Sequence, residues 1–384
     1  MKKTILRILS YILVAAVASA ATLFLSAPVQ EAPTKLDQLE DLILERFIGE
    51  ANVTAMEDGA ATGMIDSLGD RWSYYIPAAD YQEYQEQMAN AYVGVGITIT
   101  VREDLSGFDV TKVEPKGPAA EAGIRVGDLL VAANGQRVGP LGLEGSTAII
   151  KGEEGTTVDL TVLRDGVELT FTVERRLVET EVATARMLED NIGLITIFNF
   201  DSRCASETLA AIEALLEEGA QALIFDVRFN PGGYKDELVE ILDYLLPEGD
   251  LFVSEEYTNI TYVDTSDAEC LDIPMAVIVN AESYSAAEFF AAALQEYEAA
   301  IIVGQQTVGK GYYQTSFRLS DGSAVGLSIG RYCTPKGVSL EGVGITPDIP
   351  VEVDEETAAA IYALTLEPEE DPQIQAAVEA LLAG

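Results

Sequence analysis

The chain has 384 residues, of which 23 are lysine or arginine, 64 are aspartate or glutamate and none is histidine, so its formal net charge is −41. Such acidity repels phosphates and argues against nucleic acid as a partner. The lack of histidine excludes every catalytic arrangement with an imidazole base, and with only three cysteines it also argues against a structural zinc site. The length allows two or three domains.

Residues 1–30 are predicted to be a signal or a membrane anchor. Lys2, Lys3 and Arg7 precede an uncharged apolar stretch, residues 8–27. That length suits a single membrane-spanning helix whose basic flank stays in the cytoplasm. Ala18-Ser19-Ala20 also fits a signal-peptide cleavage site, so anchoring and secretion after cleavage both stay open. In either case we expect the rest of the chain to work outside the cytoplasm.

Residues 31–91 are predicted to be a helical scaffold. Apolar residues recur at spacings of three and four, which predicts a helix with one buried stripe made of Leu36, Leu39, Leu42, Ile43 and Phe47. The segment Asp70-Arg71-Trp72-Ser73-Tyr74-Tyr75 follows a second short helical pattern. We interpret it as part of the scaffold and assign it no chemistry.

Residues 92–178 have the pattern of a small β-rich domain. Gly94-Val95-Gly96-Ile97 can free successive backbone N–H groups to converge on a peptide carboxylate, and the strand that follows offers an edge for pairing. A small-residue segment at 117–130, an Asn134-Gly135 turn and a hairpin across Asp165-Gly166 follow it. This order resembles a PDZ domain, which would grip the C-termini of peptides. A PDZ domain with a purely structural role is the alternative.

Residues 179–353 alternate between predicted strands and helices, which indicates a mixed α/β domain with a central sheet covered by helices. The predicted strands are residues 193–198, 222–227, 275–279 and 300–303, and the predicted helices are residues 206–216, 236–246 and a segment from Ala286. Residues 315–319 and 324–329 read as a hairpin across Asp321-Gly322, and residues 354–384 as an acidic helical tail to which we attach no function. Ligands of such sheets bind at the carboxyl ends of the strands.

Ser285 stands where the strand at 275–279 gives way to the alanine-rich helix. The unpaired N–H groups that open a helix favour developing negative charge, so this position suits a nucleophile. Ser283 or Ser285 acting only as a helix cap, with Glu288 completing a capping box, is the alternative. A nucleophilic serine in this chain needs a base other than histidine, and lysine is the known substitute.

Lys310 is the best-placed lysine beyond residue 180, where the others are Lys235 and Lys336. It follows a predicted strand, and its flanking glycines allow a close approach of backbone. If the segment continues in an extended conformation, Lys310 and Gln314 point to the same face, because side chains repeat every two residues. Gln314 would then hold the lysine amine in position.

A serine followed 25 residues later by a lysine, and after four more by a glutamine, resembles the Ser/Lys/Gln set of the C-terminal processing proteases, the tail-specific serine peptidases. The resemblance implies a serine endopeptidase that needs no metal or organic cofactor and acts through an acyl-enzyme. By the same resemblance, Gly232 or Gly233 of Asn230-Pro231-Gly232-Gly233 would donate one hydrogen bond to the oxyanion, and the Ala286 N–H the other. The family usually has Ser-Ala-Ser-Ala-Ser-Glu where this chain has Ser283-Tyr284-Ser285-Ala286-Ala287-Glu288, a departure that bears on substrate preference.

Two other functions fit parts of the sequence. Residues 304–310 have the spacing of a phosphate-binding loop, but Gly311 stands where that loop needs serine or threonine, which disfavours an NTPase. A catalytically weak PDZ regulator that binds peptides on a protease frame is the stronger rival. The expected partners are proteins or peptides with accessible C-termini and, through residues 1–30, the membrane, and a homo-oligomer stays open. Cys204, Cys270 and Cys333 allow at most one internal bridge and are expected to be small buried apolar residues.

Overall fold

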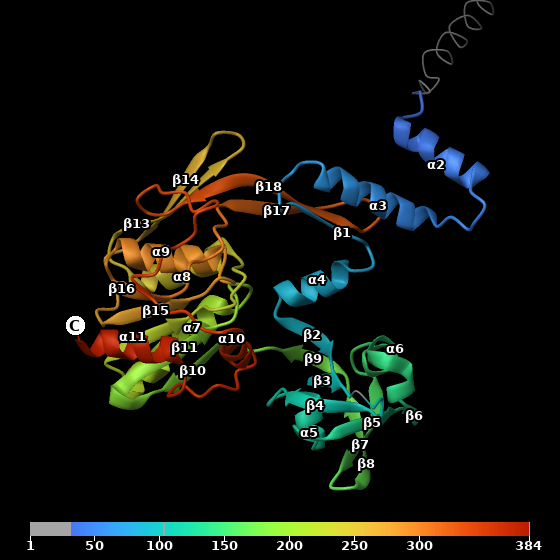
Figure 1. The fold of residues 1–384 in the computed structure, drawn as a ribbon, viewed down its shortest axis with the longest axis horizontal. Helices are drawn as coiled ribbons and strands as arrows, with labels where there is room; N and C mark the ends of the chain where they lie inside the picture. The colour runs from blue at the N-terminus through green and yellow to red at the C-terminus, as the bar shows by residue number, and fades with distance from the viewer. Residues whose placement is uncertain (1–31, 103, 384) are drawn as a thin grey trace, which may run out of the picture. The chain divides into compact units, whose positions relative to one another are not determined.

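A computed structural model describes residues 32–102 and 104–383 of the chain (Figure 1). The predicted signal or anchor at residues 1–30 lies outside these residues and stays a prediction. In the described part of the chain no helix combines the length and apolar character needed to cross a bilayer. The chain divides into two compact units, Met1–Met64 and Ile65–Gly384, which we describe separately.

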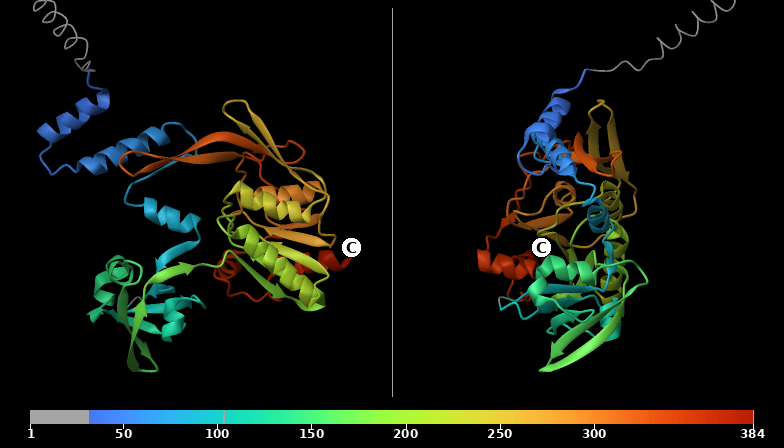
Figure 2. Two further views of the ribbon diagram at one scale, coloured as in Figure 1. Left: turned by 180° about the vertical axis from the view of Figure 1, so that it is seen from behind. Right: turned by 90° about the vertical axis from the view of Figure 1, so that its right-hand side faces the viewer.

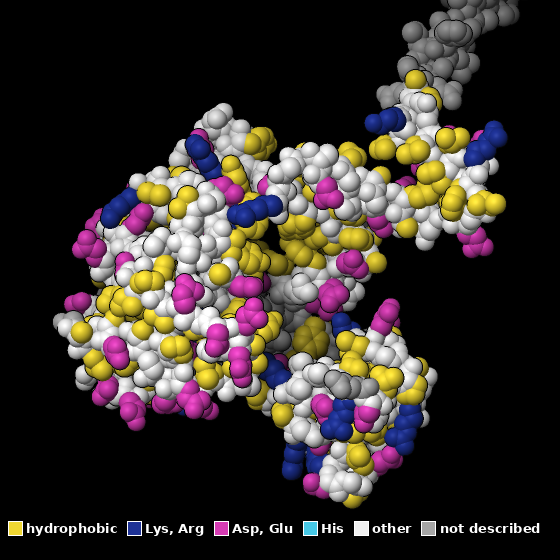
Figure 3. All heavy atoms as spheres, in the orientation of Figure 1, with side chains coloured by type: hydrophobic (Ala, Val, Ile, Leu, Met, Phe, Trp, Pro, Cys, Tyr) yellow, Lys and Arg dark blue, Asp and Glu magenta, His cyan; other side chains and the backbone are white. Residues whose placement is uncertain are grey.

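The described part of the first unit contains α2 (Lys35–Arg46) and most of α3 (Val53–Asp66). Helix α2 starts at Thr34, whose hydroxyl accepts the Asp37 N–H at 3.2 Å, as an N-cap should. The predicted buried stripe is wrong, because Leu36, Leu39, Leu42 and Phe47 are all exposed. Hydrophobic side chains accordingly appear on the surface over α2 in Figure 3. A segment of only two helices is too small to form a core that would bury an apolar face.

A small β-rich domain lies within the segment for which the sequence predicts one. Its strands form a sheet in the order β3-β4-β5-β7-β8, with β6 beside β5. The elements are β3 (Ile97–Val101), β4 (Phe108–Val113), α5 (Pro118–Ala122), β5 (Leu129–Ala133), β6 (Gln136–Arg137), α6 (Gly142–Ile150), β7 (Thr157–Arg164) and β8 (Val167–Glu174). Strands β2 (Ala91–Gly94) and β9 (Arg176–Glu179), which precede and follow this sheet in the chain, pair with each other. The β7–β8 hairpin turns at Asp165-Gly166, as predicted.

A second sheet of six strands, in the order β10-β11-β12-β15-β16-β19, forms the mixed α/β domain (Figure 1). Only β10 runs antiparallel to its neighbour. The strands are β10 (Ala183–Met187), β11 (Ile192–Ile197), β12 (Ala222–Asp226), β15 (Met275–Val279), β16 (Ala300–Gly304) and β19 (Ile349–Pro350), and the helices between them are α7 (Cys204–Glu218), α8 (Lys235–Leu245) and α9 (Ala286–Glu296). The bounds predicted for β11, β12, β15 and β16 agree within one residue, whereas β10 and β19 were not predicted.

Successive residues of each strand pack on opposite faces of this sheet, as strand periodicity requires. In β15, Val277 belongs to the core formed with α7, α8 and α9, whereas Ala276 and Ile278 belong to a second core. That second core is completed by Ile374 and Ala377 of α11 (Pro372–Ala383), which lies against the other face (Figures 1 and 2). The tail to which no function was attached, which also contains α10 (Glu355–Tyr362), is therefore an integral layer of the domain.

A further sheet joins segments far apart in the sequence. Its order is β1-β18-β13-β14, with β17 also paired to β18. The strands are β1 (Tyr74–Ile76), β13 (Gly249–Glu256), β14 (Thr261–Ser266), β17 (Tyr312–Arg318) and β18 (Ala324–Cys333), and α4 (Tyr81–Met88) follows β1. The predicted hairpin across Asp321-Gly322 is confirmed, whereas β13 and β14 were not predicted. Of the three cysteines, all free, only Cys204 is buried, and Cys270 is exposed, so the expectation of buried thiols holds for one of them.

Candidate active site

Three loops leave the carboxyl ends of neighbouring parallel strands at one edge of the six-stranded sheet. They are residues 227–233 after β12, 280–285 after β15 and 305–311 after β16. Neighbouring loops are hydrogen-bonded, as by the Tyr284 N–H, which donates to the Asn230 carbonyl oxygen at 3.1 Å. This is the edge at which α/β sheets bind ligands, and it carries both Ser285 and Lys310.

Ser285 immediately precedes α9 and has a backbone conformation that L-residues rarely adopt, with φ 59° and ψ −125°. The turn directs the residue towards a pocket that it lines, although the residue as a whole is buried. Its N–H donates to the Glu288 carboxylate at 3.0 Å, which is half of the capping box that the sequence predicts. A cap and a nucleophile are therefore not exclusive readings of this serine.

Glu288 ties the serine turn to the loop that carries Lys310. It is fully buried in α9. One carboxylate oxygen accepts the N–H groups of Ser285 and Lys310, the latter at 2.8 Å. The other accepts the Gly309 N–H at 2.7 Å and the Thr307 hydroxyl. Burial raises the pKa of Glu288, and these four donors oppose that rise by favouring the carboxylate.

Lys310 lies half-buried, with its amine beside two aromatic rings that stack on each other. The Nζ atom is 4.9 Å from the centre of the Trp72 ring and 5.7 Å from that of Tyr284. Burial lowers the pKa of Lys310 to about 8, although the carboxylates of Asp70, Glu288 and Glu341 act in the opposite direction. The other two candidates are elsewhere: Lys235 pairs with Asp264 at 2.9 Å, and Lys336 is exposed.

The segment from Asp70 to Ser73, interpreted from the sequence as scaffold without chemistry, contributes to this site. The Trp72 ring stacks on that of Tyr284 with 6.1 Å between centroids, and Arg71 donates to the Gly309 carbonyl oxygen at 2.9 Å. Asp70 lies close enough to favour the charged form of Lys310. The one signal that the sequence offered was that this is the only tryptophan of the chain.

Gln314 lines the same pocket as Lys310 and Ser285. Its amide nitrogen donates to the Ser328 hydroxyl at 3.0 Å and to the Tyr312 carbonyl oxygen at 3.2 Å. The extended run assumed from the sequence is interrupted, because β17 begins at Tyr312 and its register with β18 shifts between Tyr313 and Gln314. Gln314 and Lys310 thus line one pocket, but no hydrogen bond between their side chains is recorded among the described residues.

The glycine pair lies directly against the serine turn. A Cβ atom added to Gly232 would come within 2.7 Å of the Ser285 Cβ atom and 2.8 Å of the Ala286 nitrogen. The Gly232 N–H donates to the Asn230 side chain at 2.8 Å, whereas Gly233 lines the pocket. Within the described residues no acceptor is recorded for the N–H groups of Gly233 or Ala286. These two are therefore the groups able to face a new anion.

The glycine loop of the β-rich domain has the features that carboxylate binding needs. Gly94 ends β2, Val95 is buried, Gly96 has φ +78° and Ile97 starts β3. The carbonyl oxygens of Val95 and Gly96 accept the Ala119 and Glu114 N–H groups, which fixes the loop, while no acceptor among the described residues is recorded for their own N–H groups. Strand β3 is at the edge of its sheet and can accept a further strand.

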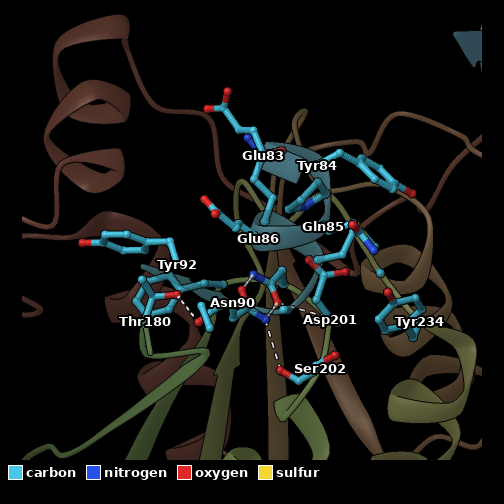
Figure 4. Close-up of a pocket in the computed structure, with 18 of the residues that line it drawn as sticks. Glu83, Tyr84, Gln85, Glu86, Asn90, Tyr92, Thr180, Asp201, Ser202 and Tyr234 are labelled. Atoms are coloured by element: carbon cyan, nitrogen blue, oxygen red, sulfur yellow. Dashed lines mark hydrogen bonds between the residues drawn. The ribbon is translucent and has the colours of Figure 1, made fainter. Parts of the chain in front are cut away.

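The pocket that holds Ser285, Lys310 and Gln314 has a volume of about 1390 Å³. That exceeds the 300–1,000 Å³ or so of a small-molecule site and suits a peptide segment. Figure 4 shows the part of it beneath α4, where Tyr84, Gln85 and Glu86 of α4 lie above Asn90, Asp201 and Tyr234. Tyrosine rings and carboxylates dominate the labelled side chains.

Comparison with known proteins agrees with this geometry. Residues 191–351 match the family described as peptidase family S41, and residues 84–174 match the PDZ domain. The carboxy-terminal processing protease CtpA of Bacillus subtilis is 30% identical over 369 residues, which cover 92% of this chain and 78% of that protein. The carboxy-terminal-processing protease of Bartonella bacilliformis is 32% identical over 305 residues, 77% of this chain and 69% of that protein.

A solved structure has the same fold. A putative S41 protease from Bacteroides fragilis matches with a TM-score of 0.57 at 15% identity, over 93% of this chain and 99% of that chain.

Proposed function

Because the chain belongs to peptidase family S41 and its carboxy-terminal processing proteases, we propose that it cleaves peptide bonds with Ser285 as nucleophile and Lys310 as general base. The observation that carries this proposal is the burial of the Lys310 amine, which lowers its pKa to about 8. At pH 7 roughly one molecule in ten then holds a neutral amine, against roughly one in 2,500 for a lysine in water.

The reaction conserves protons at each step. The neutral Lys310 amine takes the Ser285 hydroxyl proton as the oxygen attacks the peptide carbonyl, and the resulting ammonium protonates the departing amine. Water then attacks the acyl-enzyme and gives up a proton to Lys310. The bond between the acyl group and the Ser285 oxygen breaks, and the Lys310 ammonium returns the proton to that oxygen, which restores the neutral amine and the free hydroxyl. Gly233 and Ala286 N–H groups hold the oxyanion, and each such donor typically contributes about 3 kcal/mol. In this proposal Gln314, which lines the same pocket, orients the amine.

The PDZ domain selects the substrate in this proposal. The loop from Gly94 to Ile97 binds the terminal carboxylate of a protein or peptide, and the β3 edge pairs with the preceding residues. We further propose that the enzyme works outside the cytoplasm, since Lys2, Lys3 and Arg7 flank an apolar segment long enough to be an anchor or a signal.

A variant without the Lys310 amine tests the base assignment. Lys310→Ala should bind a fluorescent peptide with a free apolar C-terminus as tightly as the wild type, but should lose more than about 95% of cleavage, because general bases contribute 10²-fold or more. The exposed Lys336→Ala is the matched control and should cleave normally. Cleavage by Lys310→Ala at more than a few per cent of the wild-type rate would exclude Lys310 as the base.

A second candidate is a peptide-binding regulator with weak catalysis. It is favoured by one observation: among the described residues no hydrogen bond joins the Ser285 hydroxyl to the Lys310 amine. The same fluorescent peptide discriminates the two functions. A regulator would hold it uncut through a long incubation, and mass spectrometry would detect only the intact peptide.

A further inference from the structure

Asp201 is a carboxylate of the catalytic pocket that the proposed reaction does not use. Its neighbour Phe200 pairs with Gly233, and a Cβ atom added to Gly233 would lie 2.7 Å from the Asp201 nitrogen. The backbone of Asp201 is thus directly beside the proposed oxyanion loop. Only 9% of the residue is exposed, and it lines the pocket together with Ser285. In Figure 4 its side chain extends towards α4, on the same side as Tyr234.

The Asp201 carboxylate has no partner in the described part of the chain. Its backbone N–H donates to Asn199, but no hydrogen bond or ion pair is recorded for the side-chain oxygens. The charge of Glu237 in α8 acts on the pKa of Asp201, and the charge of Asp201 acts in turn on the pKa values of Cys204 in α7, Tyr234 and Tyr284. None of them is a cation. Burial, followed by the charge of Glu237, raises the pKa of Asp201 to about 7.

The other charged groups nearby do not supply a counter-ion either. Lys151 and Lys310 line the same pocket, but no ion pair with Asp201 is recorded for either among the described residues, and the carboxylates that act on Lys310 are Asp70, Glu288 and Glu341. Helix α4 brings Glu83 and Glu86 to the pocket. Arg203 is close in sequence, but its guanidinium donates to Glu207 and to backbone carbonyl oxygens, including that of Thr180 at 2.6 Å. A carboxylate that is buried in this way is strongly disfavoured until a cation or a proton reaches it. The pocket opening is the side from which either can come.

We propose that Asp201 determines specificity by accepting a basic side chain, lysine or arginine, of a substrate residue close to the scissile bond. The inference rests on the proposed peptidase reaction. A substrate cation would supply the missing counter-ion, and the charge-assisted hydrogen bond would form in a site with little water. The rings of Tyr234 and Tyr284 suit the aliphatic part of such a side chain and attract its charge.

Asp201 should also disfavour neutral substrates. Negative charge develops on the oxyanion beside Gly233, and an unpaired carboxylate nearby repels it. A basic side chain cancels that repulsion, whereas a neutral one leaves it in place. The preference for basic substrates therefore comes from slower cleavage of neutral substrates as well as from attraction of the basic side chain.

Matched peptides test this with the full-length chain. The set shares one apolar C-terminus and carries lysine, glutamine or glutamate in turn at each position around the cleaved bond, and mass spectrometry gives kcat/KM. At one position, lysine should exceed glutamine by about tenfold at pH 8. Asp201→Asn should bring that ratio close to one, mainly by raising the rate on the glutamine peptide. The ratio should fall below pH 7 in the wild type, and Glu237→Gln should move that fall to lower pH.

Glu83→Gln removes an exposed carboxylate of the same pocket and should leave the ratio unchanged. A wild type without preference for lysine at any position, or an Asp201→Asn variant that keeps it, would overturn the role of Asp201. If no peptide is cleaved at all, the proposed reaction fails instead. In that case, peptide binding to Ser285→Ala, measured by fluorescence anisotropy at pH 6 and 8, still tests Asp201. Tighter binding of the lysine peptide than of the glutamine peptide at pH 8 would support its role, and equal binding would overturn it.

Discussion

The Lys310 amine lies 4.9 Å from the centre of the Trp72 ring, and Trp72 also stacks on Tyr284, the residue before the proposed nucleophile Ser285. Burial lowers the pKa of Lys310 to about 8, and these two rings lie close to its amine. The attraction of an ammonium to an aromatic face acts in the opposite direction, but contributes only about 1 kcal/mol. Desolvation is the larger effect, so Trp72 should keep the base neutral.

Trp72→Ala should therefore raise the pKa of Lys310 towards the 10.5 of a solvated lysine. The neutral fraction at pH 7 would fall by about 10- to 100-fold, and kcat/KM with it, while activity should recover as the pH approaches 10. The measurement is kcat/KM between pH 6 and 10. Trp72→Phe keeps an apolar ring and serves as the control, with a profile close to that of the wild type.

Asp70→Asn should shift the pH profile of kcat/KM to lower pH. Burial raises the pKa of Asp70, but hydrogen bonds from Ser73 and Ser328 outweigh it and hold that pKa below its usual value, so the carboxylate is charged at neutral pH. Its charge favours the ammonium form of Lys310. Without it, the pKa of Lys310 should fall by up to about one unit, and activity below pH 7 should rise. A shift to higher pH would contradict the assignment.

Glu288→Gln should damage catalysis without abolishing binding. The four hydrogen-bond partners of the carboxylate, three N–H groups and one hydroxyl, all donate to it. In the glutamine variant the NH₂ group would replace one accepting oxygen and would face these donors without being able to accept from them. We expect a loss of about 1–3 kcal/mol in unfolding free energy. Misplacing the Ser285 turn against the Lys310 loop should lower kcat by about 100-fold with little change in KM. Glu282→Gln, an exposed change in the same turn, is the control.

Asp371→Asn should lower stability, since it breaks a buried ion pair. Asp371 accepts the Arg228 guanidinium at 2.8 Å, and both side chains are 3% exposed. Removing one partner of such a pair costs about 3–5 kcal/mol, and here the Asp226 carboxylate remains to offset part of that cost. Chemical denaturation monitored by circular dichroism would measure the change. The exposed Glu370→Gln should unfold like the wild type.

The sequence predicted those parts of the site that depend on local order. Ser285 follows a strand and opens a helix, and both signals lie within a few residues of it. Lys310 came from elimination, because a chain without histidine has few bases to offer. The hairpins were likewise marked by their own turn residues, Asp165-Gly166 and Asp321-Gly322.

Contacts between distant segments could not be predicted in this way. Trp72 meets Lys310 only because β1 pairs with β18, which in turn pairs with β17, and no local pattern encodes that arrangement. Asp201 follows a strand like many other acidic residues of the chain, and only the fold reveals that it is buried without a partner. The exposed apolar face of α2 was mispredicted for a related reason, since periodicity states which residues share a face but not what covers it.

The backbone of Ser285, at φ 59° and ψ −125°, has an evolutionary consequence. Glycine adopts such angles freely, whereas a serine held there costs on the order of 1–3 kcal/mol. Selection for folding alone would thus drive this codon towards glycine. A lineage that used the scaffold only to hold peptides would gain stability from a change to glycine at this position, whereas one that needed the hydroxyl for bond cleavage would lose its nucleophile.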